Sequence, residues 1–250
     1  MGILKDISFQ EESKEIKTKV KNYWTKRADS FAGARHEEFH SRQGDLWYEE
    51  ICRSIDVREG LRVLDVGCGT GFFEAVLGSH GARVTGIDLT PDMIEEGKKL
   101  LARHDIAADL FVMDAENPDF PDETFDLVIS RNLTWTLPDP VHAYQEWYRV
   151  LKKDGILLNF DAEYAKNFHS LDQTQNLAHR DLSDEMIEEC HNIYHMLTMS
   201  TLPRPAWDEE ILRQIGFREI TTNLLVSTRI YRTKHEFYVP DPMFSIRAVK

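Results

Sequence analysis

The stretch Val63–Gly71 reads VLDVGCGTG, and a second apolar run follows it and ends in Gly86-Ile87-Asp88. Apolar residues that lead into closely spaced glycines are typical of a buried parallel strand that turns sharply into a helix. Because glycine has no side chain, a ligand can approach the backbone of such a turn. Asp88 ends the next predicted strand, where a carboxylate can accept hydrogen bonds from both hydroxyls of a ribose. The pattern therefore predicts a nucleotide-type site.

The glycine spacing resembles the first motif of the class I S-adenosylmethionine-dependent methyltransferases, an acidic residue followed by Gly-x-Gly-x-Gly. A dinucleotide-binding fold has Gly-x-Gly-x-x-Gly instead, and Phe72 stands where its last glycine belongs. The resemblance covers roughly residues 60–240 and implies S-adenosyl-L-methionine as the cofactor. A dehydrogenase is the alternative if this spacing misleads.

The resemblance also assigns cofactor contacts. In the family, the first motif lies against the amino-acid part of the cofactor, the acid after the second strand binds the ribose, and an acidic motif after the third strand holds the adenine. Family analogy puts Met93 beside the adenine, although a methionine there also suits the core. The implied cofactor residues are Asp65, Gly67, Gly69, Asp88, Met93, Asp114 and Ala115.

The amino-terminal segment carries Tyr23-Trp24 and, further on, Arg27 and Phe31. It resembles a segment that folds over the cofactor in many small-molecule methyltransferases, where Tyr23 or Arg27 would reach the cofactor's carboxylate. An amphipathic helix packed on the sheet is the alternative, and we favour it for Trp24 and Phe31.

Candidates for acceptor binding and catalysis follow the fourth and fifth predicted strands, because ligands bind outside the carboxyl ends of parallel strands. Asn132 offers a donor and an acceptor where cofactor and substrate meet, so it is a candidate for binding the cofactor as well as for catalysis. Trp135 offers an apolar wall or a ring facing the sulfonium, unless it only packs under the next helix. Asp161 is a candidate general base, or else a helix cap. Further along, we expect Tyr164, Tyr194 and His195 to contact the substrate.

His191 and His195 are four residues apart, with Cys190 beside them, so one helical face could present two imidazoles to a transition metal. No further ligand at a recognised spacing completes a site. The expectation is that the protein holds no metal.

Composition and charge limit the class of protein. The chain has 250 residues, is 42% hydrophobic and carries a formal net charge of −13, which argues against nucleic-acid or anionic-lipid partners. The three cysteines are scattered, and no apolar stretch is long enough for a membrane span or a secretion signal. A cytoplasmic protein is expected, and its oligomeric state is left open.

The expected fold is α/β: a Rossmann-like, doubly wound, mostly parallel sheet that ends in an antiparallel hairpin, with a helical cap. Residues 1–250 are expected to form one methyltransferase domain. Its parts are cap helices at 1–58, a cofactor-binding core at 59–161, a cap insertion at 162–205, and a helix and hairpin at 206–250. Parallel strands are predicted at 61–66, 82–88, 108–113, 125–130 and 155–160, with helices between them, a helix at 207–215, and hairpin strands at 217–226 and 228–238.

The function that these expectations imply is methyl transfer from S-adenosylmethionine to a small molecule. Such chemistry needs alignment and exclusion of water more than acid or base groups. The alternatives are a protein- or RNA-directed methyltransferase and a non-catalytic S-adenosylmethionine-binding protein.

Overall fold

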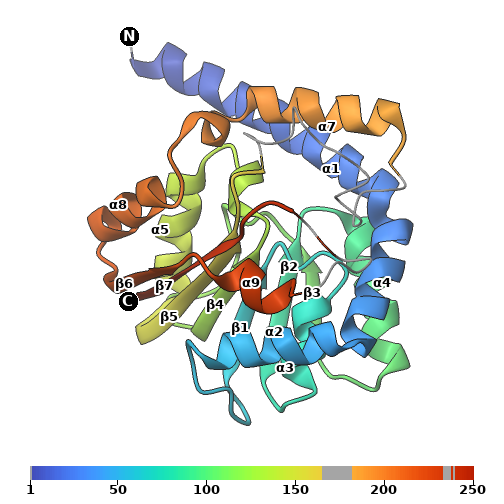
Figure 1. Ribbon diagram of the computed structural model, residues 1–250. Helices are drawn as coiled ribbons and strands as arrows, with labels where there is room; N and C mark the ends of the chain where they lie inside the picture. The colour runs from blue at the N-terminus through green and yellow to red at the C-terminus, as the bar shows by residue number, and fades with distance from the viewer. Residues whose placement is uncertain (1, 165–181, 233–237, 239) are drawn as a thin grey trace.

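A single sheet forms the centre of the computed structural model, which describes residues 2–164, 182–232, 238 and 240–250 (Figure 1). Among these residues the sheet has seven strands in the order β3-β2-β1-β4-β5-β7-β6. The strands are β1 (Arg62–Val66), β2 (Arg83–Asp88), β3 (Asp109–Val112), β4 (Phe125–Arg131), β5 (Leu151–Asp161), β6 (Arg218–Asn223) and β7 (Phe244–Val249).

The first five strands are parallel, and β7 pairs antiparallel with both β5 and β6. The strand order reverses direction between β1 and β4, which pair directly. In open parallel sheets this switch point is where the strand ends leave a crevice for a ligand. The glycine turn after β1 and Asn132 after β4 therefore lie on either side of that crevice.

Helices cover both faces of the sheet. They are α1 (Gly2–His40), α2 (Arg42–Cys52), α3 (Phe72–Gly78), α4 (Pro91–Arg103), α5 (Pro140–Val150), α7 (Asp184–Met196), α8 (Ala206–Ile215) and α9 (Val226–Ile230), with short 3-10 turns η1 (Thr134–Thr136) and η4 (Thr198–Thr201). Pro91 and Pro140 each occupy the first helical turn, where a missing N–H is tolerated. None of the helices in the described part of the chain is both long and apolar enough to cross a bilayer.

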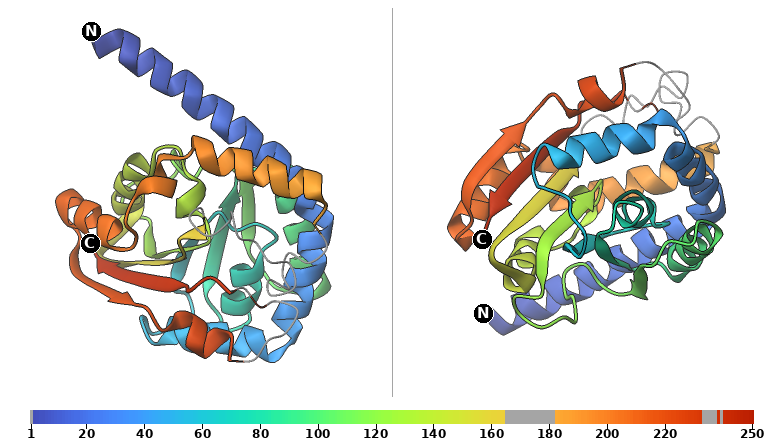
Figure 2. Two further views of the ribbon diagram at one scale, coloured as in Figure 1. Left: turned by 45° about the horizontal axis from the view of Figure 1, so that its top comes forward. Right: turned by 90° about the horizontal axis from the view of Figure 1, so that it is seen from below.

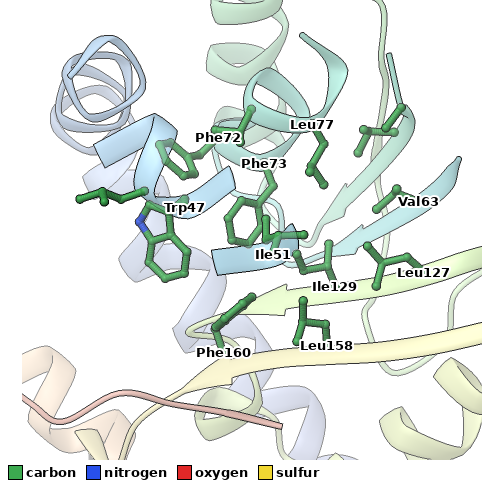
Figure 3. Close-up of a cluster of buried hydrophobic side chains, with 14 of the residues drawn as sticks. Trp47, Ile51, Val63, Phe72, Phe73, Leu77, Leu127, Ile129, Leu158 and Phe160 are labelled. Carbon is green, nitrogen blue, oxygen red and sulfur yellow. The ribbon is translucent and has the colours of Figure 1, made fainter. Parts of the chain in front are cut away.

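Alternating strand residues fill two separate cores. On one face Val63, Leu127, Ile129, Leu158 and Phe160 pack against Trp47 and Ile51 of α2 and the aromatic rings of α3 (Figure 3). On the other face Leu64, Val66, Val128 and Leu157 pack against α5 and α8. This alternation is the two-residue period of a strand that is buried on both sides. This packing on both faces of the sheet holds the carboxyl ends of β1 and β4 in place.

Helix α1 lies across the carboxyl edge of the sheet and runs beside α7 (Figures 1 and 2). A salt bridge joins Lys26 Nζ to Glu189 Oε2 at 2.8 Å, and Ile16 and Tyr23 pack against Ile193 and Tyr194. The cap helices expected at 1–58 are present as α1 and α2. The helical region expected after β5 is present as α7, while 165–181 of that region lies outside the described residues.

Three details of the expected fold are wrong. Residues 226–230 form α9, where the end of the first hairpin strand, the turn and the start of the second were expected, and the antiparallel partner of β6 is β7, so no tight hairpin joins them. The connection from Met113 to Thr124 contains turns and no helix. Strand β5 begins at Leu151, four residues before the expected start, through a register shift against β4.

Candidate functional site

The glycine turn after β1 is fixed by backbone geometry. Gly67 has φ +70° and Gly69 has φ +54°, a left-handed conformation that favours glycine. The N–H groups of Gly67 and Cys68 both donate to the carbonyl oxygen of Ile87, at 2.8 and 3.0 Å. A Cβ at Gly67 would lie 2.8 Å from Leu133 Cδ1, so the turn approaches the loop after β4 closely. The backbone itself forms this wall of the site.

Asp88 joins the glycine turn to the start of α4. Its Oδ2 accepts a hydrogen bond from the Gly69 N–H at 3.0 Å, and its Oδ1 accepts one from the Thr90 N–H at 2.8 Å. Burial raises the pKa of Asp88, and the hydrogen bonds from these two backbone N–H groups lower it by a smaller amount. Each carboxylate oxygen has two lone pairs, so both retain capacity for a ribose hydroxyl.

Asp65 is nearly fully buried beneath the same turn and lies near Glu74, which is completely buried. Burial and the neighbouring charge of Asp88 raise the pKa of Asp65 to about 8. Burial and Asp65 likewise raise the pKa of Glu74 far above its ordinary value. Two carboxyl groups removed from water cannot both ionise cheaply. Burial therefore disfavours the ionised form of both groups.

The region assigned to the adenine contains an ion cluster. Asp114 Oδ1 accepts a hydrogen bond from the Glu116 N–H at 2.9 Å. Lys17 of α1 reaches this acidic pair, with its Nζ 2.7 Å from Asp114 Oδ2 and 2.5 Å from Glu116 Oε2. The Ala115 carbonyl accepts from Trp147 Nε1 at 2.9 Å, which fixes the backbone there. Lys17 was not predicted, because it precedes Asp114 by 97 residues.

Arg27 of α1 is buried in the wall of the site, and its Nε and Nη1 have no hydrogen-bond partner among the described residues. A buried guanidinium with unpaired donors is costly unless an anion or another acceptor completes it. The α-carboxylate of an amino acid is such an acceptor. Tyr23, one helical turn before Arg27, is also buried, and burial raises the pKa of its hydroxyl.

The other end of the site is aromatic. Trp135 lies in η1, and its ring contacts those of Tyr164 and Tyr194, with centroid distances of 5.7 and 4.6 Å. Asn132 has φ +58°, and its Oδ1 accepts a hydrogen bond from the Tyr164 hydroxyl at 2.9 Å. Burial raises the pKa of both tyrosines far above the ordinary value, so their hydroxyls stay protonated near neutral pH.

One cavity of about 520 Å³ joins these parts. It extends from the glycine turn to the aromatic end, under α1 and α7. Its wall includes most of the residues singled out from the sequence: Tyr23, Arg27, Asp65, Gly67, Gly69, Asp88, Met93, Asp114, Ala115, Asn132, Trp135, Tyr164 and Tyr194. Met93 is both a core residue and part of this wall, so the two alternatives for it are compatible.

Asp161 and His195 are not among the residues that line this cavity. The Asp161 carboxylate is fully buried and accepts three hydrogen bonds: from the Trp135 N–H at 3.0 Å, the Ala162 N–H at 2.9 Å and Arg204 Nη1 at 2.8 Å. A carboxylate so engaged and so enclosed is not placed to take a proton from an acceptor. His195 is exposed, and its Nε2 lies 2.9 Å from His191 Nε2.

Arg204 connects Asp161 to a larger buried polar network. Its Nε and Nη2 bind both oxygens of Asp208, at 2.9 and 2.8 Å. The Tyr144 hydroxyl donates to Asp208 Oδ1 at 2.7 Å, and Asn159 Nδ2 contacts that hydroxyl at 3.0 Å and Thr134 Oγ1 at 2.8 Å. The network joins β5, α5 and α8 to η1, and so holds the loop that carries Trp135.

A second buried ion cluster, also unpredicted, includes Arg131 at the end of β4. Its Nη2 lies 2.9 Å from Glu38 Oε1, and its guanidinium stacks 4.1 Å from the Trp47 ring centroid. Arg35 also pairs with Glu38. Burial alone would raise the pKa of Glu38, but the two guanidinium groups hold it below its ordinary value. An arginine at the end of an apolar strand was the available signal in the sequence.

Comparison with known proteins identifies the domain. Residues 64–159 match the family described as "Methyltransferase domain". Aklanonic acid methyltransferase DauC of Streptomyces sp. (strain C5) is 42% identical over 111 residues, which are 41% of this chain and 50% of that protein. Demethylmenaquinone methyltransferase of Staphylococcus haemolyticus is 28% identical over 187 residues, 71% of this chain and 77% of that protein. The chain spans about half the length of several curated relatives that it matches.

A solved structure extends the similarity to the fold. Phosphoethanolamine N-methyltransferase 2 of Haemonchus contortus, solved with S-adenosyl-L-methionine, superposes with a TM-score of 0.57 at 19% identity, over 86% of this chain and 59% of that one. Residues 64–159 therefore match a methyltransferase domain, and the chain has a fold that is shared by a methyltransferase solved with S-adenosyl-L-methionine. The expected Rossmann-like fold is confirmed.

Proposed function

We propose that this protein transfers a methyl group from S-adenosyl-L-methionine to a small-molecule acceptor bound at the aromatic end of its cavity. The observation that carries the proposal is the single cavity that joins the glycine turn, Asp88 and Asp114 to Trp135, Tyr164 and Tyr194. When bound, the cofactor supplies an electrophilic methyl carbon activated by its sulfonium. The residues of the protein then position the acceptor relative to this methyl group.

The residues of the first half of the cavity fit this cofactor. Asp88 has free lone pairs for the ribose, and Asp114 with the Ala115 backbone offers an acceptor and a donor for the adenine. The unpaired nitrogens of buried Arg27 suit the α-carboxylate, and Asp65 suits the α-ammonium once it has lost its proton.

The second half of the cavity favours a small, largely apolar acceptor. Its described lining includes the rings of Trp135, Tyr164 and Tyr194 together with Met186, Cys190 and the Asn132 amide, and the carboxylates in the described wall, Glu37, Asp65, Asp88 and Asp114, belong to α1 or to the cofactor half. Helices α1 and α7 cover this half, which suits a small molecule better than a protein or RNA chain (Figure 2). The relatives named for aklanonic acid and demethylmenaquinone are methyltransferases of small molecules.

The chain's own groups then act by orientation. With Asp161 engaged elsewhere and the tyrosine hydroxyls protonated, no described side chain at the acceptor end is placed as a base. We infer that the acceptor presents a lone pair or anion of its own. Alignment within a dry cavity can supply a large share of the rate enhancement of a bimolecular transfer.

The test is incubation of the purified protein with methyl-labelled S-adenosylmethionine and fractions of a small-metabolite extract. The proposal expects label in a low-molecular-mass product and release of S-adenosylhomocysteine. Label in protein or RNA would favour a macromolecular acceptor. Tight cofactor binding with no labelled product in any fraction would favour a non-catalytic binding protein.

A further inference from the structure

Three histidines meet at the junction of α1 and α4, outside the cavity described above. His36 and His40 are one turn apart on α1, and His104 follows the last residue of α4. One ring nitrogen of each lies within 4.8 Å of the other two, and His40 Nε2 is 3.1 Å from His104 Nε2. The ring centroids are 4.5 to 5.4 Å apart. None of the three lines the cofactor cavity.

The spacing of these nitrogens suits a metal ion. Zn²⁺ binds imidazole nitrogen at about 2.0–2.1 Å, which places two nitrogens of a tetrahedral site roughly 3.3 Å apart. The His40–His104 separation is already close to that value. His36 would need to approach by about an ångström or somewhat more, a shift that side-chain rotation can supply. His40 is exposed, so water can reach a fourth position.

The protonation and hydrogen bonding of the three imidazole rings also favour metal binding. Burial, the neighbouring imidazoles and Arg103 lower the pKa of His36 and His104, which keeps their nitrogens unprotonated and available near neutral pH. His36 Nδ1 is buried and has no hydrogen-bond partner among the described residues. The negative charge of Glu37 raises the pKa of His36, whereas the positive charge of Arg103 lowers it. Imidazole ligands favour the divalent ions Zn²⁺, Cu²⁺ and Ni²⁺.

We propose that His36, His40 and His104 form a three-imidazole site for one divalent transition-metal ion, which fastens α1 to the end of α4. The other end of the α1–α4 contact already has a polar link, in which Thr25 Oγ1 donates to Asp92 Oδ2 at 2.9 Å. Helix α1 carries Tyr23, Arg27 and Phe31 of the cavity wall. An ion at the histidines would therefore hold the cover of the cavity at both ends.

The test uses the full chain with no polyhistidine tag, titrated with Co²⁺ and with Zn²⁺ at pH 7.5. Co²⁺ gives visible absorption bands that are strong in tetrahedral and weak in octahedral coordination, and calorimetry gives stoichiometry and affinity. His36→Gln, His40→Gln and His104→Gln each remove one ligand. His191→Gln is the matched control, because it disrupts a second i, i+4 histidine pair whose Nε2 atoms are 2.9 Å apart.

The proposal expects one ion per chain in the wild type and the control, with affinity lowered about 100-fold or more in each ligand variant. Saturating Zn²⁺ should raise the Tm of the wild type by about 5 °C or more and leave the ligand variants nearly unchanged. Thermal unfolding in EDTA checks folding, and His40→Gln, at an exposed position, guards against variants that do not fold.

Acid should also release the ion, because protons compete with the metal for the same imidazole nitrogens. Three results would each overturn the proposal. They are an absence of saturable uptake by the wild type up to about 100 µM metal, equal uptake by wild type and His104→Gln, and loss of uptake in His191→Gln with uptake retained in His104→Gln.

Discussion

Arg204 Nη1 lies 2.8 Å from Asp161 Oδ2, with both side chains removed from solvent. The contact joins the end of β5 to the turn before α8, across 43 residues of sequence. A second carboxylate, Asp208, accepts hydrogen bonds from Nε and Nη2 of Arg204. Because Asp161 also accepts the Trp135 N–H, this ion pair fixes the loop that forms the aromatic end of the cavity. We therefore propose that Asp161 is a positioning residue, whose effect on the reaction passes through Trp135.

We expect Asp161→Asn to lower the free energy of unfolding by about 1.5–3 kcal/mol, because an amide replaces the charged acceptor of three hydrogen bonds. Denaturant unfolding measures this change. The pH profile of methyl transfer should keep its wild-type shape, with a modest loss of rate. Unchanged stability with a rate lowered by about 100-fold and an altered pH profile would restore the general-base role.

Arg204→Met should have a larger effect on stability, about 3–5 kcal/mol, because it leaves two buried carboxylates, Asp161 and Asp208, without their counterion. The comparison is Arg213→Met on the same helix as Asp208, where an exposed ion pair contributes at most about 1 kcal/mol. Parallel urea titrations of the two variants check the difference. Equal midpoints would show that the buried network contributes little.

Asp65 predicts a pH dependence of stability. Its pKa is raised to about 8 in the folded protein, whereas an unfolded aspartate ionises near pH 4. Between about pH 4 and pH 8 the folded state binds one proton more than the unfolded state at this carboxyl. Its contribution to the free energy of unfolding is therefore largest below about pH 4 and falls progressively up to pH 8. Asp65→Asn should therefore become increasingly stable relative to the wild type as the pH rises, up to pH 8.

Thermal unfolding of Asp65→Asn and wild type from pH 5 to 9 measures this trend. Asp109→Asn, at an exposed position on β3, serves as the control and should track the wild type. A constant difference between Asp65→Asn and wild type across the whole range would show that Asp65 ionises normally.

Tyr194→Phe tests whether the aromatic end of the cavity binds the acceptor while the other end binds the cofactor. Tyr194 lines the aromatic end and contacts Trp135, so loss of its hydroxyl should change kcat/KM for the acceptor severalfold. The affinity for S-adenosylhomocysteine should stay within about twofold. Glu188→Gln, exposed on the same helix, is the control. Equal losses in both measurements would mean that α7 supports the whole site.

Sequence patterns predicted the features that depend on neighbouring residues. The parallel strands and the helix ending at Gly216 follow from apolar runs and caps, and the glycine turn follows from its spacing. Residues 226–230 were misassigned because Val226 and Ile230 lie among β-branched neighbours typical of strands. In the structure these two side chains are buried one helical turn apart against the core. Tertiary packing decided their conformation.

Features that depend on distant residues were not predictable in this way. The partners of Asp161 and Arg131 are Arg204 and Glu38, 43 and 93 residues away, and no local pattern links them. His195 and Tyr194 show a related limit. Successive residues of a helix point about 100° apart, so without the rotation of α7 the sequence cannot tell which of the two faces the cavity.

The most direct test of the account is the binding of S-adenosylhomocysteine, measured by calorimetry on the wild type and on Asp88→Ala, with Glu95→Ala on the exposed side of α4 as the control. We predict one site per chain, weakened by about 1.5–3 kcal/mol in Asp88→Ala and unchanged in the control, because Asp88 joins the glycine turn to the start of α4 and has lone pairs left for the ribose hydroxyls. Unchanged affinity in Asp88→Ala, or preferential binding of a nicotinamide dinucleotide by the wild type, would contradict the account.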